Sequence, residues 1–469
     1  MISRRRFVQN LLAVGIGGCI TPQTRSDSTN TFLLRMGKGK HPLVPRKYGK
    51  TEVWYFNNQI PGPQIRVRQG ETFRVLVENN LDEPSTVHWH GLRVENSMDG
   101  VPHLTQNPIL PGESFLYELK AADAGTFWYH PHQRSFEQVG RGLYGSLVVE
   151  ESEPIEIDRE FTWVLDDWQL AKDAQFAQGF SGNRHDMSHE GRMGNTVTVN
   201  GKIPQQFLIK RGERIRIRLV NAANARIFAL KFDQHQPTII SIDGQPVTPH
   251  LPDKDRYVLA PGMRMDLLLD CPGKPGQRFS LTDRYYPSQS YKLADLTYGE
   301  EIVRDEILTS EIVLPDNPLL QPDLNSGVEY DVELAGGARG NMAGANYQGQ
   351  WLDLRDLVRQ GKAWSINGVA AHGHVMDPII VLERYRTCIL NIKNDTAWPH
   401  PMHLHGHTFK VLSYNQIPLQ HQPWQDTVLI EAGDTCRIAF VADNPGKWMF
   451  HCHILEHQAA GMMAVIEVT

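Results

Sequence analysis

The chain has 469 residues, of which 41% are hydrophobic, and it contains 39 glycines and 29 prolines. This length exceeds what one hydrophobic core usually organises and predicts roughly two to four domains. The composition is typical of a soluble protein rich in strands and loops. The formal net charge of −6 offers no basic face, so nucleic acid is excluded as an expected partner.

The N-terminus carries a targeting pattern. Ser3–Val8 resembles a twin-arginine export signal, and the apolar run Leu11–Ile20 that follows is too short to span a membrane. We therefore expect residues 1–30 to be an export signal with a flexible N-terminus, and the protein to be periplasmic or otherwise exported. The alternative is a basic, disordered N-terminus. Ile16–Cys19 resembles a lipoprotein processing box, so Cys19 is either lipidated, which would be the only membrane attachment, or an apolar filler.

The rest of the chain alternates polar and apolar residues in short runs. Thr51–Phe56, Ile65–Arg68 and Phe73–Val77 predict strands separated by turns. Helical periodicity is scarce, with Trp351–Gln360 the best short candidate and a further turn expected at Val139–Tyr144. The pattern predicts an all-β protein made of sandwiches.

A long-period repeat indicates duplicated domains. Gly70 and Asn79 recur as Gly212 and Asn221, both 142 residues later, and a looser third copy ends at Asn394. This period is far longer than a solenoid unit, so it predicts three related sandwiches. The expected boundaries are 31–152 for domain one, 153–314 for domain two, 315–327 for a linker and 328–469 for domain three.

Four His-x-His pairs hold most of the chemistry: His88 and His90, His130 and His132, His403 and His405, and His451 and His453. With His400 and His457 they account for ten of the chain's 20 histidines. A structural zinc site would need only four ligands in one closed site, which disfavours zinc. A buried thiol beside satisfied histidines is the other plain alternative for Cys452, and the number of pairs argues against it.

The segment around Cys452 predicts two metal centres. Alternate side chains of a strand point to opposite faces, so His451 and His453 should lie on one face and Cys452 on the other. Cys452, His457 and a second, distant histidine would form a His₂Cys set with Met462 as a weak axial ligand, which suits a blue copper ion. His451 and His453 would then bind metal at a second, separate centre.

The repeat also predicts where the metal lies. His88 and His403 each stand nine residues after the repeated asparagine, whereas the middle copy has Leu230 there and Phe232 two residues later. His130 and His451 each follow a glycine by five residues, and the same spacing in the middle copy gives Leu281. Domains one and three should therefore form a cluster with pseudo-two-fold symmetry at their interface. Domain two should be a spacer and a wall of the substrate site.

With these motifs, the chain from about residue 45 onward resembles the three-domain multicopper oxidases, the laccase and copper-efflux oxidase family. The resemblance implies three consecutive cupredoxin-like Greek-key β-sandwich domains and four copper ions per chain. It implies a type 1 copper held by His400, Cys452, His457 and axial Met462, and a type 2 copper held by His88 and His403. The implied ligands of the type 3 pair are His90, His130, His132, His405, His451 and His453.

The resemblance also implies an activity. One-electron oxidation of a small reducing substrate would be coupled to four-electron reduction of dioxygen to water. Asp99 resembles the family's acid near the type 2 site, a candidate proton donor, or else simply forms a turn before Gly100. Gln458 stands where the copper-efflux branch has an acid, and that branch's methionine-rich insertion is missing. Both departures favour a laccase-like enzyme acting on phenols or aromatic amines.

Several alternatives stay open at this point. The chain could be a cuprous or ferrous oxidase serving copper tolerance, or a copper-free structural relative. We expect a monomer. Cys388 and Cys436 either pair or remain buried thiols. The loop from Gln178 to Gly194 holds His185, Met187, His189 and Met193, and it either binds copper transiently or is an ordinary flexible polar loop.

Overall fold

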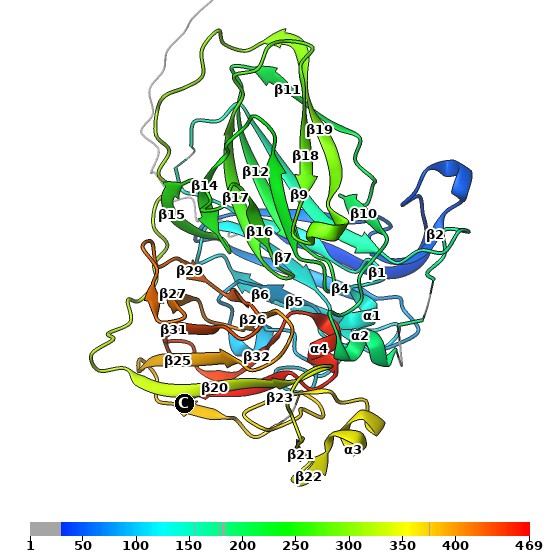
Figure 1. Ribbon diagram of the computed structural model, residues 1–469, viewed down its shortest axis with the longest axis vertical. Coiled ribbons are helices and arrows are strands. Elements are labelled where there is room, and N and C mark those ends of the chain that lie inside the picture. The colour runs from blue at the N-terminus through cyan, green and yellow to red at the C-terminus, as the bar shows by residue number, and fades with distance from the viewer. Residues whose placement is uncertain (1–29, 154, 178, 181–182, 375) are drawn as a thin grey trace, which may run out of the picture.

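Residues 30–469, except 154, 178, 181, 182 and 375, are described by the computed structural model of the chain (Figure 1). The predicted export signal and Cys19 lie outside the described residues. The described chain is built mainly of strands, which form three consecutive two-sheet sandwiches, so the all-β prediction is confirmed. None of the described helices is long and apolar enough to cross a membrane.

The first sandwich contains two four-stranded sheets. One has the order β2 (Thr51–Phe56), β1 (Thr31–His41), β4 (Thr72–Asn79), β6 (Ser114–Lys120). The other has the order β3 (Gly62–Arg68), β8 (Gly145–Glu150), β7 (Gly125–His130), β5 (His88–His90). The three strands predicted near residues 51, 65 and 73 are therefore confirmed as β2, β3 and β4.

The second sandwich has larger sheets. One has the order β10 (Thr196–Val199), β9 (Arg159–Trp168), β12 (Arg214–Asn221), β17 (Arg264–Asp270), β14 (Thr238–Ile242), β15 (Gln245–His250). The other has the order β11 (Gln206–Arg211), β19 (Tyr291–Ile302), β18 (Arg278–Asp283), β13 (Phe228–Phe232), β16 (Tyr257–Leu259).

The third sandwich repeats this plan. One sheet has the order β23 (Trp364–Ile366), β20 (Val328–Gly336), β25 (Thr387–Asn394), β31 (Thr435–Val441), β27 (Phe409–Tyr414), β28 (Ile417–Pro418), with β29 (Trp424–Gln425) also paired to β27. The other has the order β24 (Ile380–Leu382), β33 (Met463–Val468), β32 (Gly446–Cys452), β26 (His400–Leu404), β30 (Thr427–Ile430). A separate hairpin joins β21 (Gly344–Tyr347) to β22 (Gln350–Asp353).

Helices are few and short among the described residues. They are α1 (Ser135–Gln138), α2 (Arg184–Ser188), α3 (Leu354–Arg359) and α4 (Leu455–Ala459), with 3₁₀ turns η1 (Arg46–Tyr48), η2 (Asn96–Met98) and η3 (Pro287–Gln289). The helix predicted from residue 351 is wrong in its first part, because residues 350–353 form the hairpin strand β22. Asp353 then caps α3 by accepting a hydrogen bond from the backbone of Asp356 at 2.9 Å. The turn expected at 139–144 follows α1, which ends at Gln138.

The same strand order recurs in all three sandwiches. In each, the first strand pairs in parallel with the next strand of its sheet, as β1 does with β4, β9 with β12, and β20 with β25. Strands β5, β13 and β26 occupy equivalent places beside β7, β18 and β32. Equivalent residues of different domains therefore project from equivalent positions. The boundaries near residues 152, 314 and 327 stay predictions.

The middle sandwich has apolar residues in the place of the histidines. Leu230 and Phe232 are 0% and 2% exposed and belong to its core. One part of the predicted alignment is wrong, however. Leu230 lies opposite Asp283, and Leu281 lies opposite Phe232, whereas His88 lies opposite His130. The residue equivalent to His130 is thus Asp283, which lies seven residues after Gly276, whereas His130 lies five residues after Gly125.

The cysteines do not form a disulfide in the described chain. Cys271, Cys388, Cys436 and Cys452 are buried and free. Cys388 lies opposite Phe440 and Cys436 lies opposite Ile392 on the neighbouring strands β25 and β31. This offset along the two strands keeps the sulfur atoms apart, so the buried-thiol alternative is confirmed.

We predict that Leu230→Ala lowers the stability of the fold without changing the metal content. Truncating a fully buried leucine costs about 2–5 kcal/mol, and Leu230 belongs to the core of the middle sandwich. Thermal unfolding and metal analysis of the folded fraction check this. Selective loss of metal at unchanged melting temperature would make domain two part of a metal site.

Candidate metal centres

The ten histidines and Cys452 are buried within the third sandwich and where it meets the first. Each is at most 2% exposed, and they separate into two groups. His400, Cys452 and His457 form one group whose nitrogen and sulfur atoms lie within 4.8 Å of one another. Seven of the other eight histidines form overlapping groups with the same spacing, including His88 with His403 and His405, and His132 with His405 and His451. The eighth, His453, contacts them through its ring, whose centroid lies 4.9 Å from that of His90 and 5.4 Å from that of His130.

Strand β32 divides the two groups. The Cys452 sulfur lies 3.4 Å from His400 Nδ1 and 3.7 Å from His457 Nδ1. His451, one residue earlier, lies instead with its Nε2 atom 3.0 Å from that of His405. Met462 is fully buried in the same core as Cys452, and its backbone carbonyl accepts a hydrogen bond from Cys452 N at 3.1 Å. The alternation of strand side chains thus separates the thiol from its histidine neighbours.

In the first group, hydrogen bonds made by the Nε2 atoms of His457 and His400 set the tautomers of these two rings. His457 Nε2 donates to the carbonyl oxygen of His189 at 2.6 Å. His400 Nε2 donates to the hydroxyl of Thr396 at 2.9 Å, because that hydroxyl itself donates to Asn394 Oδ1. A neutral imidazole has one donor and one acceptor nitrogen, so both Nδ1 atoms carry lone pairs. They face each other at 3.1 Å beside the thiol, an arrangement that a cation satisfies.

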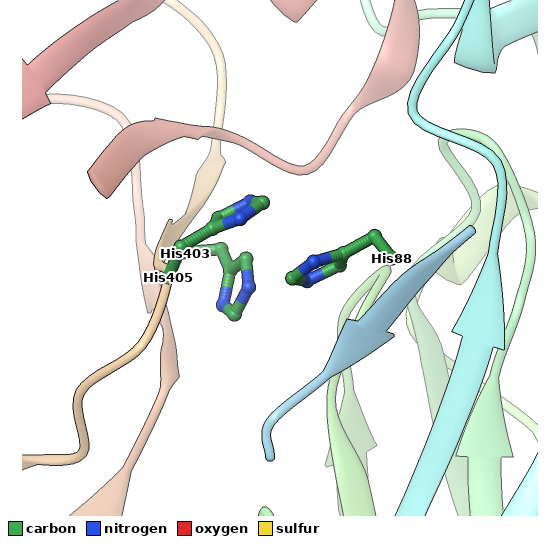
Figure 2. Close-up of side chains that lie close together, drawn as sticks. All are labelled: His88, His403 and His405. Carbon is green, nitrogen blue, oxygen red and sulfur yellow. The ribbon is translucent and has the colours of Figure 1, made fainter. Parts of the chain in front are cut away.

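The second group brings together side chains from two domains. Figure 2 shows His88, from β5 of the first sandwich, facing His403 and His405 from the end of β26 in the third. The rings of His88 and His405 stack with their centroids 3.9 Å apart. Those of His90 and His403 stack at 3.8 Å. Each sister domain therefore contributes one ring to each stacked pair, which is the pseudo-two-fold arrangement expected from the repeat.

Two buried aspartates hold these rings in a crossed pattern. The Asp99 carbonyl accepts from His88 Nδ1 at 2.8 Å, and its carboxylate accepts from His405 Nδ1 at 2.9 Å. The Asp426 carbonyl accepts from His403 Nδ1 at 2.8 Å, and its carboxylate accepts from His90 Nε2 at 3.1 Å. Each acid thus orients one ring of its own domain and one of the sister domain. Asp426 was not predicted.

The remaining ring nitrogens fit a metal. His405 and His451 both donate through Nδ1, to Asp99 and to the Cys452 carbonyl, so their Nε2 atoms face each other as two acceptors. Within these eight histidines, all of which the structure describes, seven further ring nitrogens lack a hydrogen-bond partner. These are His88 Nε2, His90 Nδ1, His130 Nε2, His132 Nδ1, His403 Nε2 and both nitrogens of His453. Buried polar atoms without partners are costly, and metal ions would satisfy them.

Burial also sets the protonation of the ligands. It lowers the pKa of nearly all of these imidazoles, well below the usual value for His400 and His405 and to about 3 for His457. The imidazoles with a lowered pKa are therefore neutral near pH 7, which is the form that binds metal. Burial raises the pKa of the Cys452 thiol, so this sulfur keeps its proton until a metal displaces it.

Helix α4 places a glutamine and a glutamate beside the two groups. Gln458 accepts a hydrogen bond from the Ser135 hydroxyl at 3.0 Å, and its amide nitrogen lies 3.4 Å from His132 Nε2. Glu456, which was not predicted, accepts from Asn224 Nδ2 at 2.8 Å. Burial raises the pKa of Glu456 to about 7.

The described residues 183–194 of the predicted loop contact the first group through the carbonyl oxygen of His189. Helix α2 in this segment contacts α4 (Figure 1). The rings of His185 and His189 stack with centroids 4.0 Å apart. Met187 packs against the core of the third sandwich, and Met193 Sδ accepts a hydrogen bond from the Tyr286 hydroxyl at 3.7 Å. Met187 and Met193 are thus engaged in packing.

Comparison with known proteins agrees with this geometry. Family profiles described as multicopper oxidase match residues 39–154, 159–305 and 348–469. The multicopper oxidase MmcO of Mycobacterium tuberculosis is 31% identical over 87% of this chain and 81% of its own. Laccase-1 of Fomitopsis schrenkii is 30% identical over 87% and 81%. A multi-copper oxidase structure from Pseudomonas thermotolerans is 34% identical, with a TM-score of 0.82 over 94% of this chain and 99% of that one.

Multicopper oxidases use oxygen and reducing substrates, and the family implies copper as the metal. With three matching domains and a buried His₂Cys group beside a histidine cluster, this chain belongs to the multicopper oxidase family.

Proposed function

We propose that this protein is a laccase-like multicopper oxidase with four copper ions, coupling one-electron oxidation of small reductants to four-electron reduction of dioxygen to water. The observation that carries the proposal is the position of Cys452. Its sulfur belongs to one group of ligands, and the rings of His451 and His453 on either side of it contact histidines of the other. One strand thus joins an electron-accepting site covalently to the histidine cluster.

The residues are proposed to divide as follows. The type 1 copper would be held by His400, Cys452 and His457, with Met462 axial. The type 2 copper would be held by His88 and His403, and the type 3 pair by His90, His130, His132, His405, His451 and His453. When bound, the copper ions supply the redox chemistry, and the protein sets their geometry and burial.

Asp99 is the proposed proton donor. It is fully buried, and its carboxylate contacts rings of both sister domains, 2.9 Å from His405 Nδ1 and 3.2 Å from His88 Nδ1. It also occupies a tight turn, since Gly100 has φ +82° and a Cβ there would lie 1.9 Å from the Val87 carbonyl oxygen. The turn therefore fixes where the acid points. Gln458 cannot ionise and so cannot share this role.

A metal-ion oxidase is the second candidate, favoured by the cover over His457. Three successive carbonyls at the end of α2 accept hydrogen bonds from the third sandwich, each at 2.6 Å. Their donors are Trp364 Nε1 to Met187, Ala338 N to Ser188, and His457 Nε2 to His189. The ring edge of His457 is thus closed to direct contact with a bulky phenol. Small electron donors such as metal ions avoid this obstacle, and so does electron transfer through the His189 backbone.

Export through the twin-arginine pathway and a monomeric state are part of the proposal. They are supported by the arginine-rich N-terminal sequence and by the composition, and a lipid on Cys19 would provide the only membrane attachment. The mass of the mature chain recovered from the periplasm tests both processing and lipidation. An uncleaved chain retained in the cytoplasm would contradict export.

Cys452→Ser should abolish the intense blue absorption and leave the histidine cluster's copper largely bound. The thiolate belongs to only one of the two groups, and eight histidines of the other are untouched by the change. Visible absorption and copper analysis check the outcome. Loss of all copper together would contradict the division into two centres.

Met462→Leu should keep the blue band and raise the reduction potential of the type 1 copper. An axial thioether is a long, weak ligand that tunes the potential more than it holds the metal. Redox titration followed at the blue band measures the shift. A colourless variant would show that Met462 does not act as a weak axial ligand.

Trp364→Phe should raise kcat/KM for a methoxy-substituted phenol about fivefold, with a smaller change for Fe(II) and Cu(I). The change removes one hydrogen bond, worth about 1 kcal/mol, that holds the cover, and keeps an aromatic ring beside His457. Trp168→Phe is the matched control, because that indole donates to Thr198 at 2.9 Å within domain two. Equal effects on all three substrates would argue that the cover does not select between them.

A further inference from the structure

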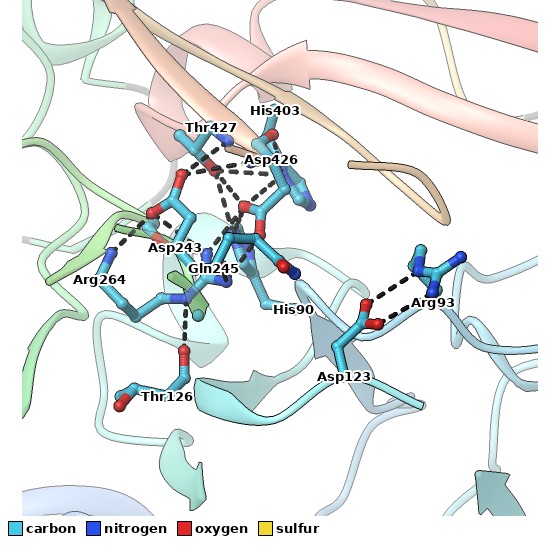
Figure 3. Close-up of polar contacts among 12 residues, drawn as sticks. His90, Arg93, Asp123, Thr126, Asp243, Gln245, Arg264, His403, Asp426 and Thr427 are labelled. Atoms are coloured by element: carbon cyan, nitrogen blue, oxygen red, sulfur yellow. Dashed lines mark hydrogen bonds and ion pairs between the residues drawn. The ribbon is translucent and has the colours of Figure 1, made fainter. Parts of the chain in front are cut away.

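One buried arginine of the middle domain contacts all three sandwiches. Arg264 begins β17, is 0% exposed, and lies beside Thr126 of β7 and Asp426 of the third sandwich (Figure 3). Its Nε atom donates to the Thr126 carbonyl at 3.1 Å. Its two terminal nitrogens donate to the two carboxylate oxygens of Asp426 at 2.8 and 2.6 Å. This paired, charge-assisted geometry is the strongest that a side chain offers a carboxylate.

A second residue of the middle domain fixes the backbone at the same point. Asp243 lies between β14 and β15, and its Oδ1 atom accepts from Arg264 N at 2.9 Å. Its Oδ2 atom accepts from Thr427 N at 3.1 Å and from Asp426 N at 3.3 Å. Domain two therefore holds both the side chain and the main chain of Asp426.

The clamped aspartate in turn orients one histidine from each sister domain. Its carbonyl accepts from His403 and its carboxylate from His90, as Figure 3 shows. These bonds decide which ring nitrogens stay free, namely His403 Nε2 and His90 Nδ1. Hydrogen bonds to the far nitrogen of a ligand imidazole commonly set its tautomer and orientation.

Charge explains why the clamp is needed. A buried carboxylate is unstable without a compensating charge. Burial raises the pKa of Asp426, but Arg264 and His403 outweigh burial and hold this pKa below its usual value. Asp99, its counterpart in the first sandwich, has ion-pair contacts only with His88 and His405 among the described residues. The two acids are therefore alike in their ring contacts and differ in charge compensation.

The middle domain also touches the rings directly. Gly262, two residues before Arg264, has φ +86°. A Cβ atom at this position would lie 2.8 Å from two atoms of the His453 ring and 3.1 Å from His90 Cε1. The turn that carries Arg264 is thus packed against the cluster, which limits how far the arginine or the rings can move.

We propose that Arg264 is a positioning residue of the oxygen-reducing centre, acting through Asp426 to fix the orientation and tautomers of His90 and His403. This inference rests on the proposed copper roles of those histidines. The middle domain, although it supplies no ligand, then supports one side of the cluster through a residue that bonds to the histidines. Its effect should reach the type 2 and type 3 coppers and leave the type 1 copper unchanged, because neither Arg264 nor Asp426 contacts His400, Cys452 or His457.

The test compares two buried arginines of the same domain. Arg264→Met removes the clamp, and Arg216→Met is the matched control. Arg216 is 1% exposed and its guanidinium lies 2.7 Å from carboxylate oxygens of Asp266 and Glu151, but it has no bond to a histidine among its described contacts. Both changes remove a buried ion pair, so both should lower the melting temperature. Copper content, the type 2 electron paramagnetic resonance signal and the blue absorption are measured on each.

Arg264→Met should weaken copper binding at the histidine cluster about 10–100-fold and change the type 2 signal, with the blue absorption intact. Arg216→Met should keep full copper content and an unchanged type 2 signal. Asp426→Asn is the second variant, since it keeps the shape of the side chain if Arg264→Met does not fold, and it should alter the same signal. Arg264→Lys, which keeps the charge and loses the paired geometry, should recover part of the copper affinity.

The inference is overturned if Asp426→Asn and the folded Arg264 variants bind copper and give a type 2 signal as the unmodified protein does. It is also overturned if Arg216→Met shows the same spectral change, because the effect would then be general loss of stability. A failure of the proposed function looks different. In that case the unmodified protein itself, fully supplied with copper, would lack the blue band or the type 2 signal.

Discussion

The rest of the structure depends on two places where unprotonated imidazole nitrogens face each other. His405 and His451 meet at 3.0 Å and His400 and His457 at 3.1 Å, and in each pair the far nitrogens already donate elsewhere. Two acceptors cannot bond to each other, so these contacts cost free energy in the metal-free protein and are relieved by a cation. The fold must therefore supply enough rigidity to hold the rings before metal arrives. The three sandwich cores supply it.

The histidine cluster is symmetric in its rings and asymmetric in its support. Asp99 and Asp426 play matching parts toward the two stacked pairs, as expected for an interface between duplicated domains. Only Asp426 is neutralised by an arginine, and that arginine comes from the domain that is not part of the symmetry. A fixed anion suits positioning, whereas an acid without a paired cation is better suited to exchanging protons. Their different surroundings thus suit Asp426 to positioning the rings and Asp99 to the proposed proton exchange.

Sequence spacing predicted what depends on local geometry. The alternation of strand side chains is enough to separate Cys452 from its neighbouring histidines, and the repeat places His-x-His pairs on equivalent strands. Asp426 could not be found this way, because it lies 21 residues after His405 whereas Asp99 lies nine after His90. The connecting segments differ between the copies, so the repeat carries no common offset. Arg264 gave no signal either, since its partners in the sister domains, Thr126 and Asp426, are each more than 100 residues away in the sequence.

The middle domain is more than the spacer that its lack of histidines suggested. It reaches both candidate centres, covering His457 with the end of α2 and bracing Asp426 with Arg264. Because this domain contributes none of the proposed ligands, its His189 carbonyl can bond to His457 and its Arg264 guanidinium can bond to Asp426 without competing for a metal ion. Its apolar core, with Leu230 in the place of a ligand, keeps those contacts rigid. A central copy without ligands is therefore placed to contact a ligand of one candidate centre and to hold the aspartate that orients two histidines of the other.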